Sequence, residues 1–238
     1  EPHAVGKSAA AQWHDQRMRQ IQLDFVQRFA QPPGKLLDIG CATGEFLVAA
    51  RTAGWQVEGI ELVAEAAEAA RQQHGLAGAT GCAESQLHGD VQLDVITLWD
   101  VVEHLRQPMA VFARCWEALK PGGWLIFAIP NINSFDRQLF GNAWLGWETP
   151  RHLFFFDEAT LPRLLRETGF EQRGAACLVG GRGVFQVSLE TAVRETGWEA
   201  IIKQIMNQLL TSLWPYRQIS YRLNKGSVLS VAVQRGGA

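Results

Sequence analysis

Three groups of residues in this chain have types and spacings that could do chemistry. The first is the run from Leu36 to Leu47 (LLDIGCATGEFL), in which an apolar stretch ends in Asp38 and is followed by Gly40 and Gly44. This pattern predicts a buried strand, a tight turn and a helix start, because glycine adopts positive φ angles and leaves room for a ligand. Backbone N–H groups that open a helix are unpaired and can bind an electron-rich group. Open α/β sheets bind nucleotide-like ligands at such turns.

The second group is a single carboxylate. Glu61 lies 23 residues after Asp38 and ends the next predicted strand. In a strand–helix–strand unit, an acidic side chain at this position lies beside the glycine turn and can accept hydrogen bonds from both ribose hydroxyls. Sites for NAD and for S-adenosylmethionine (SAM) share this feature. Glu61 therefore indicates a nucleoside ligand without choosing between them, and a solvated charge at a strand end is the alternative.

The glycine spacing favours SAM over a dinucleotide. A dinucleotide site would carry G-x-G-x-x-G, but Ala42 stands at the position of the second glycine and hinders the close approach of a pyrophosphate. The pattern D-x-G-x-x-x-G instead resembles motif I of the class I SAM-dependent methyltransferases. Two later stretches resemble motifs II and III of that family in the same order, Asp94–Leu105 (DVITLWDVVEHL) and Leu119–Leu125 (LKPGGWL).

Within this family, the chain is most similar to the O-methyltransferases of ubiquinone biosynthesis and their relatives. The residues that carry this likeness are Asp100–His104 (DVVEH) and Pro150–Phe156 (PRHLFFF). The resemblance spans roughly residues 36–170 and implies SAM as cofactor, with S-adenosylhomocysteine as product. It also implies which residues contact the cofactor: Asp38, Gly40, Cys41, Ala42, Thr43, Gly44, Glu61, Leu62, Ala83, Glu84, Trp99 and Asp100.

The third group is a pair of histidines. His104 follows the predicted strand 93–98, and His152 lies in the long connection 131–156, where these proteins build their substrate side. If the acceptor is a hydroxyl, a general base can remove its proton, and a histidine pKa of about 6.5 suits that task near neutrality. We therefore assign acid/base roles to His104 and His152, with a structural hydrogen bond as the alternative for each.

A metal is a less favoured reading of the same region. Asp100-x-x-Glu103-His104 resembles a metal-ligand spacing in some ubiquinone O-methyltransferases and small-RNA methyltransferases, and positions i, i+3 and i+4 of a helix share one face. However, Glu-His is common here in relatives without a metal, and aspartate replaces the usual glutamate. We assign no metal from the sequence. Asp100 would then line the SAM pocket, while Glu103 would cap or pair locally.

The elements that must position these residues alternate between strand and helix. This alternation predicts a Rossmann-like, doubly wound α/β sheet of seven mostly parallel strands with an antiparallel last strand. The strands are predicted at 35–39, 55–61, 77–80, 93–98, 124–129, 170–179 and 227–234, and the helices at 8–30, 45–53, 62–75, 108–119 and 161–168.

Four parts of the chain follow from this order of elements. Residues 1–34 form an N-terminal helical segment, and residues 35–183 form the SAM-binding core with a substrate loop at 131–156. Residues 184–226 form a helical insert, and residues 227–238 form the last strand and a tail. The insert has apolar residues at helical spacing near 201–210 and an interruption at Trp214-Pro215-Tyr216. A lid or an oligomer contact is favoured for it over a membrane contact.

Composition limits the partners. The chain has 238 residues, of which 47% are hydrophobic and 19% charged, as expected of a globular protein with a sizeable core. A net charge of −2 supplies no basic field for nucleic acid. The four cysteines are far apart and form no C-x-x-C pair, so a reducing, cytoplasmic location is expected. The sequence contains no run of 18 or more apolar residues, so we expect no integral membrane association.

The favoured function is therefore SAM-dependent methylation of a small molecule, most simply at oxygen, by an enzyme that could form a homodimer. Two alternatives stay open at this point. One is a nicotinamide-dependent oxidoreductase with a related sheet and the same acidic residue. The other is a SAM-binding protein without turnover that acts as a partner subunit.

Overall fold

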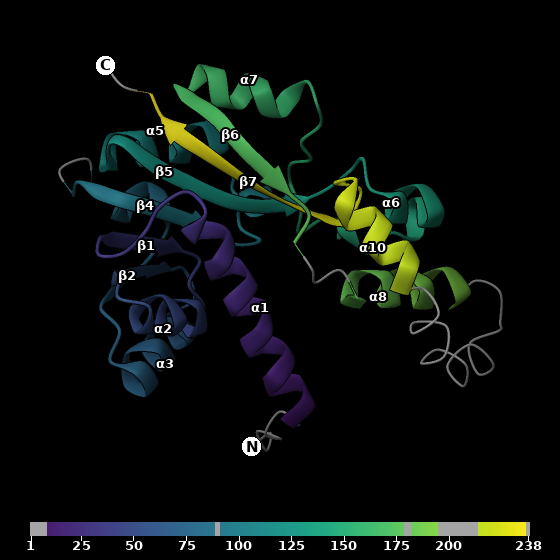
Figure 1. Cartoon of the computed structure of the whole chain (residues 1–238), viewed down its shortest axis with the longest axis horizontal. Helices are drawn as coiled ribbons and strands as arrows, with labels where there is room; N and C mark the ends of the chain where they lie inside the picture. Colours follow the sequence, from purple (N-terminus) through teal and green to yellow (C-terminus); the bar gives the residue numbers. More distant parts are fainter. Residues whose placement is uncertain (1–8, 89–90, 179–181, 195–213, 237–238) are drawn as a thin grey trace.

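The computed structural model describes residues 9–88, 91–178, 182–194 and 214–236. Seven strands of this part form one sheet in the order β3-β2-β1-β4-β5-β7-β6 (Figure 1). Strands β1 to β5 pair in parallel, whereas β7 runs antiparallel to both β5 and β6. The predicted doubly wound sheet is thereby confirmed. The strands are β1 (Lys35–Ile39), β2 (Gln56–Glu61), β3 (Gly78–Thr80), β4 (Leu93–Leu98), β5 (Leu119–Pro130), β6 (Phe170–Ala176) and β7 (Val228–Arg235).

Helices lie on both faces of the sheet (Figure 1). The α-helices are α1 (Ala9–Gln27), α2 (Glu45–Thr52), α3 (Ala64–His74), α4 (Ala83–Gln86), α5 (Pro108–Ala118), α6 (Phe135–Phe140), α7 (Thr160–Glu167), α8 (Arg182–Arg194) and α10 (Trp214–Arg222). Three short 3-10 helices are η1 (Val102–His104), η2 (Gly141–Ala143) and η3 (Leu145–Trp147). None of the helices in the described ranges is both long and apolar enough to cross a membrane.

The central strands are apolar on both sides because each side faces a separate core. On β5, Leu125, Phe127 and Ile129 enter the core covered by α5 and α7. The alternate residues Ile126 and Ala128 enter the core covered by α1 and α2. Successive side chains of a strand point to opposite faces, and burial of each large apolar side chain stabilises the fold by about 1.5–3 kcal/mol. The sheet is therefore a rigid support for the loops at its carboxyl edge.

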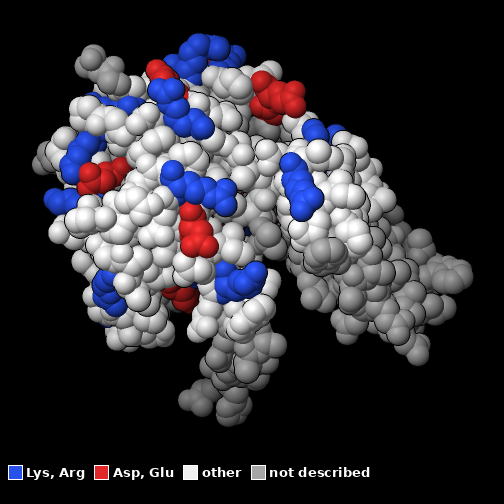
Figure 2. Space-filling model, viewed as in Figure 1, with Lys and Arg blue, Asp and Glu red and all other residues white. Residues whose placement is uncertain are grey.

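A smaller lobe of α6, α8 and α10 stands beside this edge of the sheet (Figure 1). It has an apolar centre of its own, in which Phe185 packs with Phe140, Leu189 and Tyr216. Asp136 of α6 joins the lobe to the sheet, since it accepts hydrogen bonds from the Tyr216 hydroxyl (2.8 Å) and from the Ser227 hydroxyl next to β7. The space-filling view shows a hollow between this lobe and the rest of the molecule (Figure 2).

Several boundaries differ from those predicted. The strand predicted at 124–129 begins earlier, because Leu119 already pairs with Leu93 and an irregularity in the register absorbs the Lys-Pro-Gly-Gly segment. Helix α10 begins at Trp214, the position of the predicted interruption, and Pro215 is tolerated there because N–H groups in a first turn have no helical partner. Short α4 and α6 occupy segments expected to be loops. The helical stretch expected near 201–210, the helix start at Ser8 and the strand end at Val179 lie outside the described residues.

Candidate active site

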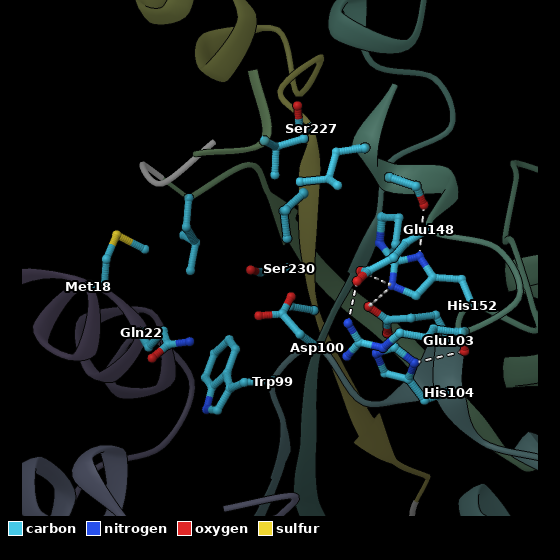
Figure 3. Close-up of a pocket in the computed structure, with 18 residues that line it drawn as sticks. Met18, Gln22, Trp99, Asp100, Glu103, His104, Glu148, His152, Ser227 and Ser230 are labelled. Carbon is cyan, nitrogen blue, oxygen red and sulfur yellow. Dashed lines mark hydrogen bonds and ion pairs between the residues drawn. The ribbon is translucent and has the colours of Figure 1, made fainter. Parts of the chain in front are cut away.

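Two cavities adjoin at the carboxyl ends of the parallel strands. Cavity A has a volume of about 610 Å³ and lies over the ends of β1 and β2. Cavity B has a volume of about 400 Å³ and lies between the end of β4, the start of β7 and α1 (Figure 3). His104 lines both cavities, so this residue stands at their junction.

The turn after β1 has the conformation that its glycines allow. Gly40, Ala42 and Gly44 have positive φ angles of 76°, 47° and 90°. A Cβ atom at Gly40 would lie 2.4 Å from Val101 Cγ2, and one at Gly44 would lie 2.3 Å from Leu76 Cδ1. Both glycines are therefore required by backbone conformation and by packing together. Gly40 lines cavity A without a side chain that would occupy part of it.

Glu61 ends β2 and points at this turn. Its carboxylate accepts hydrogen bonds from the backbone N–H groups of Ala42 (2.8 Å) and Val63 (2.9 Å), one on each oxygen. Each carboxylate oxygen has a second lone pair, and Glu61 lines cavity A. The side chain is therefore held in one orientation and can still accept hydrogen bonds from a ligand.

The cofactor residues implied by the resemblance fall into three sets. Gly40, Glu61, Leu62, Ala83 and Glu84 line cavity A. Trp99 and Asp100 line cavity B. The remaining residues lie in or beneath the turn and do not line either cavity: Asp38, Cys41, Ala42, Thr43 and Gly44.

Asp38 and Cys41 face the protein interior. Asp38 is 3% exposed and accepts a hydrogen bond from the Thr97 hydroxyl (2.6 Å), which joins β1 to β4. Burial raises the pKa of Asp38 to about 7, and the hydrogen bond from Thr97 partly opposes this rise. Cys41 points toward Gly59 of β2, and burial raises the pKa of its thiol to about 12. These two residues shape the turn from below.

Three side chains meet on one wall of cavity B, and we call them the histidine cluster: Glu103, His104 and His152. One ligand atom of each lies within 4.8 Å of the others. The imidazoles of His104 and His152 contact edge to face, with ring centroids 4.7 Å apart. His104 ends η1, directly after β4, whereas His152 follows η3 in the connection after β5. The fold thus unites the two histidines that the sequence separates by 48 positions.

Backbone carbonyls determine the orientation of both imidazoles. His104 Nδ1 lies 2.9 Å from the carbonyl oxygen of Arg151, and His152 Nδ1 lies 2.8 Å from that of Gly146. A carbonyl oxygen only accepts, so each Nδ1 carries the hydrogen and each neutral ring presents an unprotonated Nε2. Both Nε2 atoms are available to accept a proton or to bind a cation.

Glu103 is the most buried member of the histidine cluster. Its side chain is 2% exposed, and its Oε2 atom has no hydrogen-bond partner. Burial, with smaller contributions from the charges of Asp100 and Glu148, raises the pKa of this carboxyl to about 8. The Glu103 backbone carbonyl accepts from Leu153 N–H (2.8 Å), which clamps the connection after β5 against η1.

The polar wall of cavity B contains residues that the sequence pattern did not single out. Glu148 has a left-handed backbone (φ 29°), and its Oε2 lies 3.3 Å from His152 Nε2. Gln22 of α1 is buried and lines the cavity beside Trp99, with its Oε1 accepting from Arg19 (2.9 Å). The spacing i, i+4 of Met18 and Gln22 was the available signal, because it places both on one face of α1.

Cavity A has the features of a nucleotide-type site, and cavity B adjoins it. Comparisons with known proteins agree with such a site. A family model described as a methyltransferase domain matches residues 13–173. This chain belongs to the methyltransferase family. The methyltransferase is 27% identical over 195 residues to the ubiquinone biosynthesis O-methyltransferase of Burkholderia pseudomallei, which covers 72% of this chain and 84% of the relative. It is 30% identical over 188 residues to the ubiquinone biosynthesis O-methyltransferase of Bordetella bronchiseptica, and this match covers 69% of this chain and 78% of the relative.

Solved structures agree on the fold. A SAM-dependent methyltransferase from Thermotoga maritima superposes with a TM-score of 0.59 at 17% identity, over 95% of this chain and 94% of the other. A phosphoethanolamine N-methyltransferase of Haemonchus contortus, solved with S-adenosylhomocysteine, superposes with a TM-score of 0.59 at 16% identity, over 92% of this chain and 53% of the other. The methyltransferase uses SAM as its cofactor. The oxidoreductase alternative is thereby excluded.

The histidine cluster also fits a divalent cation. Two imidazole Nε2 atoms and a carboxylate are common ligands of such ions, and an imidazole that ligates a metal usually donates its other N–H to a carbonyl or carboxylate. Both imidazoles meet this condition. The unpartnered Oε2 of buried Glu103 is a further sign, because a buried carboxylate oxygen normally has a partner. No metal was assigned from the sequence, because Glu-His is common in relatives without a metal and aspartate replaces the usual glutamate at position 100. The structure adds His152 to Glu103 and His104.

Proposed function

We propose that this enzyme transfers the methyl group of SAM to a hydroxyl group of a small-molecule acceptor. The observation that carries the proposal is the position of His104, a residue that lines both cavities and whose imidazole has Nδ1 anchored and Nε2 free. The similarity to O-methyltransferases of ubiquinone biosynthesis supports oxygen as the accepting atom. The size of cavity B supports a small acceptor.

The cofactor would lie across both cavities. We assign the ribose hydroxyls to Glu61 and the adenine ring to Leu62, Ala83 and Glu84 in cavity A. The amino-acid end would extend over the turn of Asp38, Gly40, Cys41, Ala42, Thr43 and Gly44 toward Trp99 and Asp100 of cavity B. This orientation directs the methyl group toward the junction of the cavities, next to His104.

Methyl transfer from a sulfonium is an in-line displacement whose leaving group requires no proton. Positioning of the two reactants can therefore supply much of the rate, up to about 7–11 kcal/mol. The hydroxyl of the acceptor must lose its proton. In the enzyme without a bound cation we assign this step to Nε2 of His104 or His152, because an Nε2 atom that ligates a cation has no lone pair left for a proton. General base catalysis of this kind contributes about 10²–10⁴-fold.

A divalent cation would be held by the histidine cluster. Such an ion acts as a Lewis acid that polarises a bound oxygen and lowers the pKa of its proton. The residues themselves would orient the acceptor hydroxyl against the methyl group. Apolar side chains of Leu145, Leu178, Val184 and Val228 line the rest of cavity B and would hold the acceptor body.

Release of S-adenosylhomocysteine in the presence of an acceptor library tests the reaction. We expect acceptor-dependent release, with kcat lowered by about 10²–10⁴-fold in His104→Gln and unchanged in His88→Gln, because His88 is exposed. Binding of SAM without release for any acceptor would favour the non-catalytic partner subunit. Full activity of His104→Gln would show that His104 is not the general base.

Isothermal titration with SAM and S-adenosylhomocysteine tests the cofactor assignment. Glu61→Ala should weaken both ligands by about 10- to 100-fold, since hydrogen bonds to a charged group contribute about 1.5–3 kcal/mol each. Glu65→Gln on the exposed side of α3 is the matched control. Unchanged affinity in Glu61→Ala would remove the ribose assignment.

Two features support our proposals for the surroundings of the site. Val184 of α8 lines cavity B, so the described start of the insert, residues 184–194, would act as a lid over the acceptor, with a homodimer contact as a second use of the same part. The four cysteines are unpaired thiols, which fits a reducing compartment such as the cytoplasm. On the face in Figure 2, basic and acidic side chains are interspersed, as suits an enzyme of small molecules.

A further inference from the structure

One wall of cavity B brings together atoms that all carry lone pairs. His152 Nε2 lies 3.3 Å from Glu148 Oε2 and 4.0 Å from Glu103 Oε1. Because His152 Nδ1 already donates to the Gly146 carbonyl, the Nε2 of the neutral ring has no hydrogen to offer to either carboxylate. Figure 3 shows the three side chains converging from η1 and from the connection after η3. A cation bound between them, or a proton shared by them, would make this arrangement favourable.

Glu103 adds an independent sign of a missing partner. Its side chain is 2% exposed, and its Oε2 atom accepts no hydrogen bond. An unpartnered buried polar atom is destabilising by about 1–3 kcal/mol, so a site of this kind usually has a ligand or a functional reason. His104 lies beside Glu103 and His152, since one ligand atom of each of these three residues lies within 4.8 Å of the others.

Glu148 is fixed in a way that suits a ligand. Its left-handed backbone aims the side chain at His152, a conformation that is rare for residues other than glycine. Arg151 forms an ion pair with Glu148 Oε1, which leaves Oε2 facing the imidazole. The side chain is 34% exposed, so it has room to adjust to an ion.

Asp100 is oriented differently, although the family-like spacing places it among the metal ligands. Figure 3 shows its carboxylate pointing into the open part of cavity B, on the side of Gln22 and Ser230. Within the described part of the chain, the carboxylates within 4.0 Å of the His152 imidazole nitrogens are those of Glu103 and Glu148.

We propose, on the basis of the methyltransferase site described above, that Glu148 is a ligand of a divalent cation held with Glu103, His104 and His152, in the place that the family-like spacing gives to Asp100. Two imidazoles with two carboxylates form a mixed nitrogen and oxygen set, which suits a first-row ion such as Mn²⁺. The competing occupant is a proton on His152, which would form an ion pair with Glu148 inside the chain.

Titration of the full chain with Mn²⁺, followed by electron paramagnetic resonance without SAM, separates these occupants. We expect one bound Mn²⁺ per chain and an affinity that falls by more than about 10- to 100-fold in Glu148→Gln, since that range applies to groups that only support a metal ligand. Asp100→Asn and the exposed Glu158→Gln, its matched control in the same connection, should bind Mn²⁺ as the wild type does. Thermal unfolding of each variant checks that it is folded.

Two outcomes would overturn the proposal. If Asp100→Asn loses Mn²⁺ while Glu148→Gln keeps it, the ligand is Asp100. If the wild type binds no Mn²⁺, a proton on His152 explains its contact with Glu148. Titration with S-adenosylhomocysteine distinguishes either failure from a failure of the proposed function, because cavity A would still bind that ligand in an enzyme without the cation.

Discussion

Two buried carboxylic acids, Asp38 and Glu103, show how burial alters the chemistry of single residues at this site. Asp38 beneath the glycine turn has one donor, the Thr97 hydroxyl, whereas Glu103 has a side-chain oxygen with none. Burial raises the pKa of both, to about 7 and about 8. Both are therefore close to the protonated state near neutral pH, and a change at either position alters stability as well as activity.

Asp38→Asn should reduce the pH dependence of stability. The pKa of Asp38 rises from 3.8 to about 7 on folding. Its contribution to stability is therefore complete below pH 3.8 and is lost as the pH rises through about 7, by on the order of a few kcal/mol. Urea unfolding across this pH range should show that the variant gains stability relative to the wild type as the pH rises.

A control with the opposite sign is available at the start of α7. Hydrogen bonds from Thr160 lower the pKa of Asp157, so its contribution is present at neutral pH and is lost as the pH falls. Asp157→Asn should therefore lose stability relative to the wild type at neutral pH and not in acid. A parallel response of both variants would contradict the assigned role of burial at Asp38.

At the scale of elements, the site depends on where strands end. β1, β2 and β4 end at the same edge of the sheet, and the residues that follow them line the cavities. The turn between β1 and α2 must then pass close to α3 and to the residues after β4. Its glycines allow this approach, so packing between elements and the shape of cavity A are linked at the same positions.

A pair of glycine variants separates backbone strain from packing. Gly44 and Gly75 both have positive φ, but a Cβ atom at Gly75 meets nothing within 4 Å, whereas one at Gly44 lies 2.3 Å from Leu76 Cδ1. Gly75→Ala should lower stability by about 1–2 kcal/mol through the backbone alone. Gly44→Ala should add about 1–3 kcal/mol, because buried Leu76 must move.

Thermal unfolding measures this difference. For a domain of this size, 1 kcal/mol corresponds to about 2–4 °C in Tm, so Gly44→Ala should melt clearly below Gly75→Ala. Equal Tm values would mean that Leu76 repacks freely and that Gly44 is required by the backbone only.

At the scale of the whole molecule, the enzyme is a rigid sheet with a smaller lobe attached at one edge. Hydrogen bonds from Tyr216 of α10 and from Ser227 converge on Asp136, and Ser227 also lines cavity B. The attachment of the lobe is therefore part of the wall of the proposed acceptor site. Cavity A lies at a distance from it, over β1 and β2. Changes in the lobe should affect the acceptor more than the cofactor.

Tyr216→Phe tests this division. The variant removes one hydrogen bond to a carboxylate, worth about 1.5–3 kcal/mol, and should raise KM for the acceptor while affinity for S-adenosylhomocysteine stays unchanged. Leu223→Ala, at an exposed position one residue after α10, is the control for changes near this helix. Equal weakening of acceptor and cofactor would show that the lobe and the sheet do not act separately.

The sequence by itself determined the order of strands and helices, the glycine turn, Glu61 and SAM as the cofactor. These features depend on neighbours in the chain: apolar periodicity, positive φ at glycine, and a carboxylate at a strand end. The motifs that resemble those of the family follow one another in the family's order between Leu36 and Leu125. The match of the family model over residues 13–173 covers the same part.

Only the tertiary structure decided the composition of the histidine cluster. His152 reaches His104 and Glu103 because the connection after β5 folds back, with its backbone bonded to the carbonyl of Glu103 and the carbonyl of Arg151 bonded to His104. Glu148 and Gln22 join cavity B from the same connection and from α1. No local pattern encodes such contacts, because they arise where segments distant in the chain exclude water together and must satisfy one another's polar groups.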